Sequence, residues 1–128
     1  MMVAAVATLG ARALLGAQKK QQRKPDLELV KIDSVRQEGG IVFEGDIKVT
    51  GEKAFVGLVM RFEFYDSGGE LLTIQKIQIE EATIFPREQK HFQVQGKDVP
   101  RAVRYTVSAS DLGGRELLLG RNGPYPLD

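Results

Sequence analysis

The sequence contains no cysteine, no tryptophan and a single histidine, His91, in 128 residues. The lack of cysteine excludes disulfides, thiolate nucleophiles, cysteine-ligated metal sites and lipid attachment through a cysteine of this chain. Neither sign of charge dominates, because 18 Lys and Arg stand against 17 Asp and Glu. Dedicated nucleic-acid-binding proteins usually carry a clear basic excess, so we expect no nucleic-acid partner. This length suits one domain with its own hydrophobic core.

Acidic residues are also absent before Asp26, in a stretch that is apolar up to Ala17 and basic afterwards. A helix of about 17 residues spans roughly 25 Å, less than the ~30 Å hydrocarbon core of a bilayer. Three interpretations stay open: an export signal or its remnant, a membrane anchor or docking helix, and a transit peptide or disordered tail. We therefore divide the chain into an apolar, helical segment (residues 1–24) and a globular domain (25–128). The side chains expected to dock on a membrane or partner are Leu9, Arg12, Leu14, Leu15, Lys19 and Lys20.

The clearest strand pattern runs from residue 56 to 65 and stops at the turn sequence Asp66-Ser67-Gly68-Gly69. Every second residue is apolar, and the opposite parity carries Arg61, Glu63 and Tyr65. This alternation predicts a central strand with one face in a core and the other towards water. The inward set is expected to be Val56, Leu58, Met60, Phe62 and Phe64.

Alternating segments separated by Gly, Pro and Asp turns recur through the rest of the globular domain, without a helical period. Such a pattern indicates an all-β, immunoglobulin-like antiparallel sandwich of about seven strands. The other strands are expected at residues 27–36, 41–50, around 72–79, 89–95, 102–110 and 116–120, followed by an extended surface tail.

Three of these segments carry local irregularities. Residues 27–36 have apolar side chains on both parities, which predicts an edge strand that bends or changes sheet. Gly45 occupies an inward position, where it either admits a bulky neighbour from the facing sheet or marks a bulge. The apolar parity also changes at Gln75-Lys76, which predicts a bulge there or a crossing between sheets. Further side chains expected in the core are Phe85, at one end, and Val103, Tyr105, Val107 and Ala109.

The sequence holds little that points to catalysis. His91 is expected on the solvent face of its strand, with no nucleophile and carboxylate at triad spacing. Glu80 and Glu81 are neighbours in sequence, so their side chains diverge. The turn at Asp66 lacks the spacing of a Ca²⁺ loop, and we interpret it and its counterpart at Asp111 as two hairpins with the same Asp-x-Gly-Gly chemistry. We expect no enzyme activity, no cofactor and no metal site.

Phe62-Glu63-Phe64-Tyr65-Asp66, followed by Gly68-Gly69, resembles the motif of the FxLYD domain family, an immunoglobulin-like sandwich of bacterial and archaeal proteins. Phe64 replaces the Leu of that motif. Gly45 and the turn from Pro86 to Phe92 are also similar to the family, and the resemblance covers residues 27–119. It implies an exported, often membrane-tethered module without assigned catalytic residues. The lipobox cysteine usual in such proteins is missing here.

These features predict a non-enzymatic protein-binding or assembly module at or outside the bacterial cytoplasmic membrane. The expected location is the cell envelope, or alternatively the cytoplasmic face of the membrane, and an accessory subunit of a membrane complex is one form of this prediction. Contact is expected through Arg61, Glu63 and Tyr65, since Tyr and Arg are enriched in interfaces, or through an edge strand such as 27–36. The alternative is an exported sandwich that binds a small ligand or Ca²⁺ with loops near Asp66 and Asp111 at one end.

Overall fold

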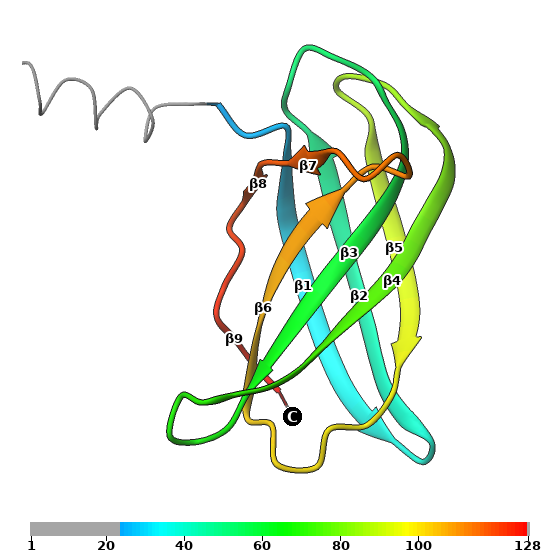
Figure 1. The fold of residues 1–128 in the computed structure, drawn as a ribbon. Coiled ribbons are helices and arrows are strands. Elements are labelled where there is room, and N and C mark those ends of the chain that lie inside the picture. The colour runs from blue at the N-terminus through cyan, green and yellow to red at the C-terminus, as the bar shows by residue number, and fades with distance from the viewer. Residues whose placement is uncertain (1–23, 128) are drawn as a thin grey trace, which may run out of the picture.

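The computed structural model describes residues 24–127, which form nine strands and no helix (Figure 1). Within this range there is consequently no helix long and apolar enough to cross a membrane. The strands are β1 (Leu27–Gln37), β2 (Gly40–Val49), β3 (Phe55–Tyr65), β4 (Leu71–Ile84), β5 (Gln89–Gly96), β6 (Arg104–Ser110), β7 (Glu116–Leu117), β8 (Leu119–Gly120) and β9 (Tyr125–Pro126).

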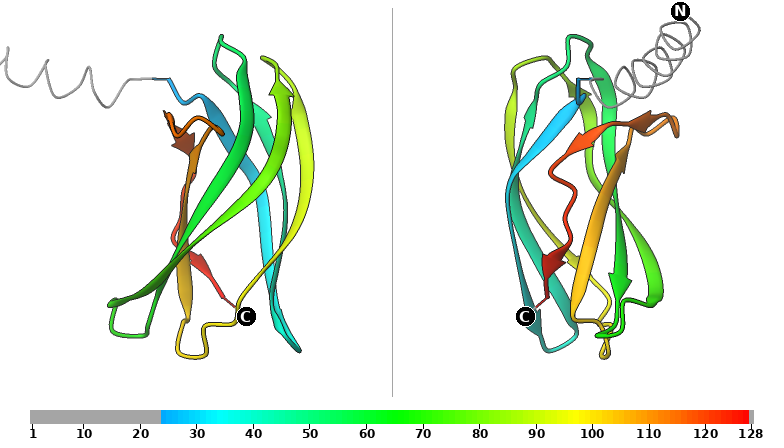
Figure 2. Two further views of the ribbon diagram at one scale, coloured as in Figure 1. Left: turned by 45° about the vertical axis from the view of Figure 1, so that its right-hand side comes forward. Right: turned by 90° about the vertical axis from the view of Figure 1, so that its left-hand side faces the viewer.

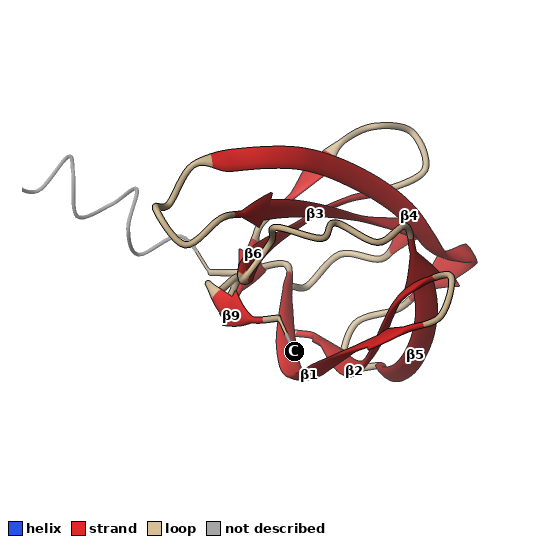
Figure 3. Cartoon of the chain, turned by 90° about the horizontal axis from the view of Figure 1, so that it is seen from below, coloured by secondary structure: helices blue, strands red, loops and turns tan. Residues whose placement is uncertain are grey.

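The strands form two facing sheets, which confirms the predicted antiparallel β-sandwich. The first sheet has the order β5-β2-β1-β8, and the second has the order β4-β3-β6-β7 with β9 also paired to β6. The hairpins β1–β2 and β3–β4 each stay within one sheet, whereas the connections β2–β3, β4–β5 and β5–β6 cross between the sheets. Seen along the strands, the two layers enclose a single core (Figure 3).

The predicted central strand is β3, which lies between β4 and β6 in the second sheet. Its residues Leu58, Met60, Phe62 and Phe64 are fully buried. The Phe62 ring stacks on Phe43 of the first sheet with a centroid distance of 4.2 Å. Fully burying one such side chain contributes roughly 1.5–3 kcal/mol, so this row of β3 is a main source of the sandwich's stability.

Val56 is not part of the core, contrary to the alternation in the sequence: its side chain is 57% exposed. The register of β3 against β4 shifts between Val56 and Leu58, and Gly57 between them adopts a φ of +73°. This irregularity reverses the parity at the start of β3, so Phe55 enters the core in place of Val56.

β1 contains a bulge that explains its apolar residues on both parities. The register against β2 shifts between Leu29 and Lys31, which leaves Val30 without a partner. Leu29 is therefore buried on one side of the bulge, and Ile32 packs against the core on the other. The strand bends as predicted and stays in one sheet, where only its first two residues pair with the short strand β8.

Two close neighbours require glycine at position 45 of β2, although neither comes from the facing sheet, as the first of the two interpretations expected. A Cβ atom at this position would lie 2.2 Å from the carbonyl oxygen of Lys31, which the bulge of β1 brings close. It would also lie 3.0 Å from the ring of Phe92 on β5, which is the neighbouring strand of the same sheet. Any side chain at position 45 would therefore require both the backbone of Lys31 and the ring of Phe92 to move.

The bulge predicted at Gln75-Lys76 is wrong in position. Phe64 pairs with Thr73 and Tyr65 with Leu71, so the unpaired residue is Leu72. Because the parity reverses there, Ile74 turns outward and is 38% exposed, whereas a bulge at Gln75-Lys76 would have kept its side chain inside. A second register shift leaves Ile79 of this edge strand unpaired. Bulges of this kind twist an edge away from unwanted pairing with other chains.

Phe85 and Val103 are likewise outside the core, with exposures of 56% and 41%. β4 continues to Ile84, which is fully buried and occupies the end of the core that Phe85 was expected to fill. Val103 lies just before β6, with its amide bonded to the carbonyl of Tyr65.

The predicted strand at 116–120 is divided between the two sheets. β7 pairs with β6 in the second sheet, and β8 then pairs in parallel with β1 in the first. β9 returns to β6, so the C-terminal chain runs along the seam between β1 and β6 (Figure 2, right). Leu117 and Leu119 of this segment are buried, and so is Leu127 of the tail that was expected to lie on the surface. The tail therefore contributes one side chain to the core.

Polar bridges close the opposite seam, between β4 and β5. Glu80 forms an ion pair with Lys90, and Gln75 exchanges hydrogen bonds with the backbone of Lys97. The Lys90 ammonium, together with the amides of Ala82 and Glu81, lowers the pKa of the Glu80 carboxyl to about 2. The Glu80 carboxylate therefore has a structural role in joining β4 to β5.

Candidate functional site

The outer face of the second sheet brings together the three residues predicted to form an interface. Glu63 accepts hydrogen bonds from Arg61 Nη2 at 3.1 Å, from the Tyr65 hydroxyl at 3.4 Å and from the Thr106 hydroxyl at 3.2 Å. All four side chains are half-buried and come from β3 and β6. The result is a hydrogen-bonded unit, centred on Glu63, in the middle of a sheet face.

Apolar side chains of β4 border this unit, which the sequence pattern did not predict. Leu71 lies opposite Tyr65 and Ile74 lies opposite Glu63, with exposures of 46% and 38%. The bulge at Leu72 places both on the outer face. We refer to Arg61, Glu63, Tyr65, Thr106, Leu71 and Ile74 together as the β3 face.

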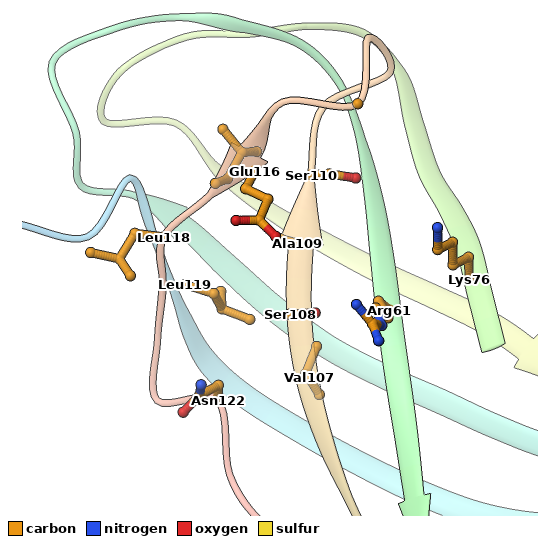
Figure 4. A pocket seen from close by; sticks show the side chains of 12 residues that line it. Arg61, Lys76, Val107, Ser108, Ala109, Ser110, Glu116, Leu118, Leu119 and Asn122 are labelled. Carbon is orange, nitrogen blue, oxygen red and sulfur yellow. The ribbon is translucent and has the colours of Figure 1, made fainter. Parts of the chain in front are cut away.

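A pocket of about 330 Å³ continues from the β3 face across β6. Figure 4 shows Arg61 and Lys76 side by side on β3 and β4, with Ser108 and Ser110 projecting from β6 towards them. Glu116, Leu118, Leu119 and Asn122 lie on the other side of β6 (Figure 4). The pocket thus joins a polar floor on the sheet to the chain segment that leaves β6.

His91 lies on the solvent face of β5, as predicted, but it is not isolated. Its Nδ1 lies 2.8 Å from Asp46 Oδ1, and its Nε2 lies 2.9 Å from Glu44 Oε2. These two carboxylates, Asp46 first, raise the pKa of His91 above its usual value. The group contains no Ser or Thr hydroxyl, so it does not assemble a nucleophilic triad. The sequence showed Glu44 and Asp46 as acidic residues on the outward side of 41–50. Only the pairing of β2 with β5 brings them next to His91.

Asp66 and Asp111 form matching turns, as the repeated sequence predicted. The Asp66 carboxylate accepts bonds from the amides of Gly68 and Glu70, and Asp111 accepts one from Arg115. They end β3 and β6, which run antiparallel as neighbours, so the two turns lie at opposite ends of the sandwich. The predicted ligand site that combined both loops at one end is therefore wrong.

Within residues 24–127, no group of three or more His, Asp or Glu side chains is placed to hold a metal ion. The expected docking residues of the N-terminal segment lie outside the described residues, namely Leu9, Arg12, Leu14, Leu15, Lys19 and Lys20.

No family model and no curated protein matches this sequence. Among solved structures, a calcium-binding mutant of Bacteroides uniformis beta-glucuronidase 2 matches with a TM-score of 0.55 and 17% identity, over 80% of this chain and 14% of that chain. A crystal structure of Bacteroides uniformis beta-glucuronidase matches with a TM-score of 0.52 and 15% identity, over 74% of this chain and 14% of that one. IrmA from Escherichia coli matches with a TM-score of 0.48 and 12% identity, over 82% and 99% of the two chains.

The chain therefore corresponds to 14% of the length of the glucuronidases that it matches. At these identities the likeness shows the β-sandwich fold alone. It does not transfer an activity or a binding site to this chain.

Proposed function

We propose that this protein is a non-enzymatic protein-binding or assembly module of the bacterial cell envelope. The β3 face carries the proposal. It presents Tyr65 and Arg61, residue types that are enriched in interfaces, next to the exposed apolar side chains of Leu71 and Ile74. The bonds to Glu63 hold Arg61 and Tyr65 in place before any partner arrives, which reduces the entropy cost of binding.

The envelope location rests on the sequence of the N-terminal segment and on the resemblance to exported modules. In this proposal the apolar and basic residues 1–24 tether the sandwich to the membrane, and the module serves as an accessory subunit of a larger complex. The chain enters the sandwich at Pro25 and Asp26, where Asp26 bonds Leu118 and Gly51.

Site-specific photo-crosslinking in native membranes tests the proposal. The crosslinking residue p-benzoyl-phenylalanine replaces Tyr65 in one variant and Gln93, on the outer face of the first sheet, in the control. We expect one discrete adduct from position 65 and none from position 93. Equal, diffuse labelling from both positions would show that the β3 face is not an interface. Once the partner is known, Tyr65→Ala should weaken binding about thirtyfold, as expected for a hot-spot side chain.

Intact-mass measurement of the purified protein tests the tether separately. Retention of residues 1–24 supports a membrane anchor or docking segment. Their absence means that the segment is a cleaved export signal, and it removes the tether from the proposal while leaving the β3 face in place.

A further inference from the structure

One cross-strand row of the second sheet places two cations beside each other. Arg61 lies directly opposite Lys76 on β4 and Ser108 on β6. Directly opposed residues in an antiparallel pair have Cβ atoms about 4.5–5.5 Å apart, and like charges at this spacing are destabilising. The row itself contains no carboxylate. From this arrangement we propose that Lys76, Arg61 and Ser108 form a binding site for a carboxylate group.

The Arg61 guanidinium supplies the second observation. Glu63 engages only its Nη2 atom, at 3.1 Å. Its Nε is shielded from solvent and has no hydrogen-bond partner, and among residues 24–127 it is the single buried side-chain nitrogen or oxygen in that state. A buried donor without a partner costs about 1–3 kcal/mol, so native structures rarely keep one without a ligand, ion or water to satisfy it.

The surroundings of this row suit an anion. The pocket of about 330 Å³ provides room above it, and Ser108 and Ser110 present hydroxyl donors on the side of β6 that faces Arg61 and Lys76 (Figure 4). The backbone of Lys76 pairs with β3, but its side-chain ammonium forms no hydrogen bond or ion pair with any described residue and is therefore available. The acid that lines the pocket, Glu116, lies across β6 from this group (Figure 4).

Charge balance favours a carboxylate over a phosphate. Arg61 and Lys76 together with Glu63 carry a net charge of one positive unit. A carboxylate neutralises this charge, whereas a phosphate near its dianionic state would leave an excess of negative charge next to the half-buried carboxylate of Glu63. Arginine also presents its donors in a planar fork that matches the two oxygens of a carboxylate.

The carboxylate has two conceivable sources, an acidic side chain of a partner protein and a free small carboxylate. The site shares Arg61 with the β3 face, so the first source rests on the function proposed above, while the anion site itself does not. The two sources share the same contacts and are separated by the probes described below.

The test uses the full chain labelled with ¹⁵N, at constant ionic strength. The Nε–Hε resonance of Arg61 is assigned by its loss in Arg61→Lys. Two capped peptides of sequence Ala-Ala-Glu-Ala-Ala and Ala-Ala-Gln-Ala-Ala, sodium acetate and inorganic phosphate are titrated separately. We expect saturable shifts of the Arg61 Nε–Hε and Ser108 amide resonances with acetate and the Glu peptide, and none with the Gln peptide.

Variants locate the site and control for general charge effects. Lys76→Gln should weaken binding of the Glu peptide about tenfold, because it removes one charge-assisted contact. Ser108→Ala should weaken it less and serves if Lys76→Gln disturbs the sheet. Lys48→Gln, which removes the same charge from the outer face of the first sheet, should leave the affinity unchanged.

The outcomes are distinct. Tighter binding of the Glu peptide than of acetate identifies an acidic side chain of a partner as the source, and equal binding identifies a free carboxylate. Shifts that never saturate, that persist undiminished in Lys76→Gln, or that are larger for phosphate overturn the proposal. If they do so while position 65 still crosslinks a partner, the protein-binding function stands without the carboxylate site.

Discussion

Tyr105 should give the sandwich a specific weakness at alkaline pH. Its side chain is 1% exposed, in contact with the Phe43 ring at a centroid distance of 5.2 Å. Burial is the main cause that raises the pKa of Tyr105 from 10.0 to about 12, and a hydrogen bond with Ser34 partly opposes it. The folded state therefore holds the phenol neutral over a pH range in which the unfolded chain ionises it.

The sign and magnitude follow from this difference. Because the folded-state pKa is raised, the stabilisation is fully present below pH 10 and is lost as the pH rises from about 10 to about 12. A shift of about two units corresponds to roughly 3 kcal/mol. Native domains have only about 5–15 kcal/mol in total, so this single group should remove a substantial fraction of the stability.

The comparison of wild type with Tyr105→Phe isolates the effect. Guanidinium unfolding followed by circular dichroism, at intervals between about pH 9 and about pH 12, gives the free energy of unfolding of each. The variant should lose roughly 3 kcal/mol less than the wild type over this range. Ultraviolet absorbance of tyrosinate should show one phenol that ionises only as the protein unfolds.

Phe64→Leu serves as the control, because it removes core volume next to Tyr105 without removing an ionisable group. It should lower stability at every pH and keep the wild-type dependence on pH. If Tyr105→Phe loses stability in parallel with the wild type, the phenol is not held neutral by burial, and the reasoning is refuted.

Two further predictions concern the first sheet. Gly45→Ala should destabilise the protein by about 1–3 kcal/mol, because the added Cβ would meet a backbone oxygen. Gly68→Ala is the control and should change the stability little, since its Cβ would have a nearest contact of 3.4 Å. Chemical denaturation of both variants measures the difference. The imidazole of His91 should titrate above 6.5, so its stabilising contribution is present below pH 6.5 and is lost as the pH rises through the folded-state pKa. Asp46→Asn should lower the midpoint measured by NMR, and an unchanged midpoint would contradict the role of that carboxylate.

The alternation of residues 56–65 was sufficient to predict the central strand and its orientation. From Leu58 to Phe64 every expected inward side chain is buried, and Glu63 lies outward as expected. The Asp-x-Gly-Gly turns could also be predicted from the sequence, because their hydrogen bonds join residues that are close in sequence. Local sequence patterns predict these features correctly because the interactions that determine them are themselves local in sequence.

The wrong faces expected for Val56 and Ile74 share one physical cause. Where a bulge inserts one residue, every following side chain changes face, and this happened at Gly57 and Leu72. The sequence showed that the parity changed in β4 but not at which residue. The position depends on how β3 and β4 pair, which is a property of two strands together.

The candidate site was only half visible in the sequence. Arg61, Glu63 and Tyr65 were predicted as one outward row of a single strand. Thr106, Lys76 and Ser108 join them from strands that lie on either side of β3. Nothing in their own segments marks them as partners, because a cross-strand contact has no fixed spacing in sequence.

The sequence by itself determined the fold class, the main strands and the turn chemistry, since these follow from hydrophobic period and backbone preference. It also excluded every function that requires cysteine. Only the tertiary structure decided that the segment at 116–120 divides between β6 and β1, that His91 meets Asp46 and Glu44, and that two cations share one row. These features depend on strand register, which emerges when the sheets pair and pack around a common core.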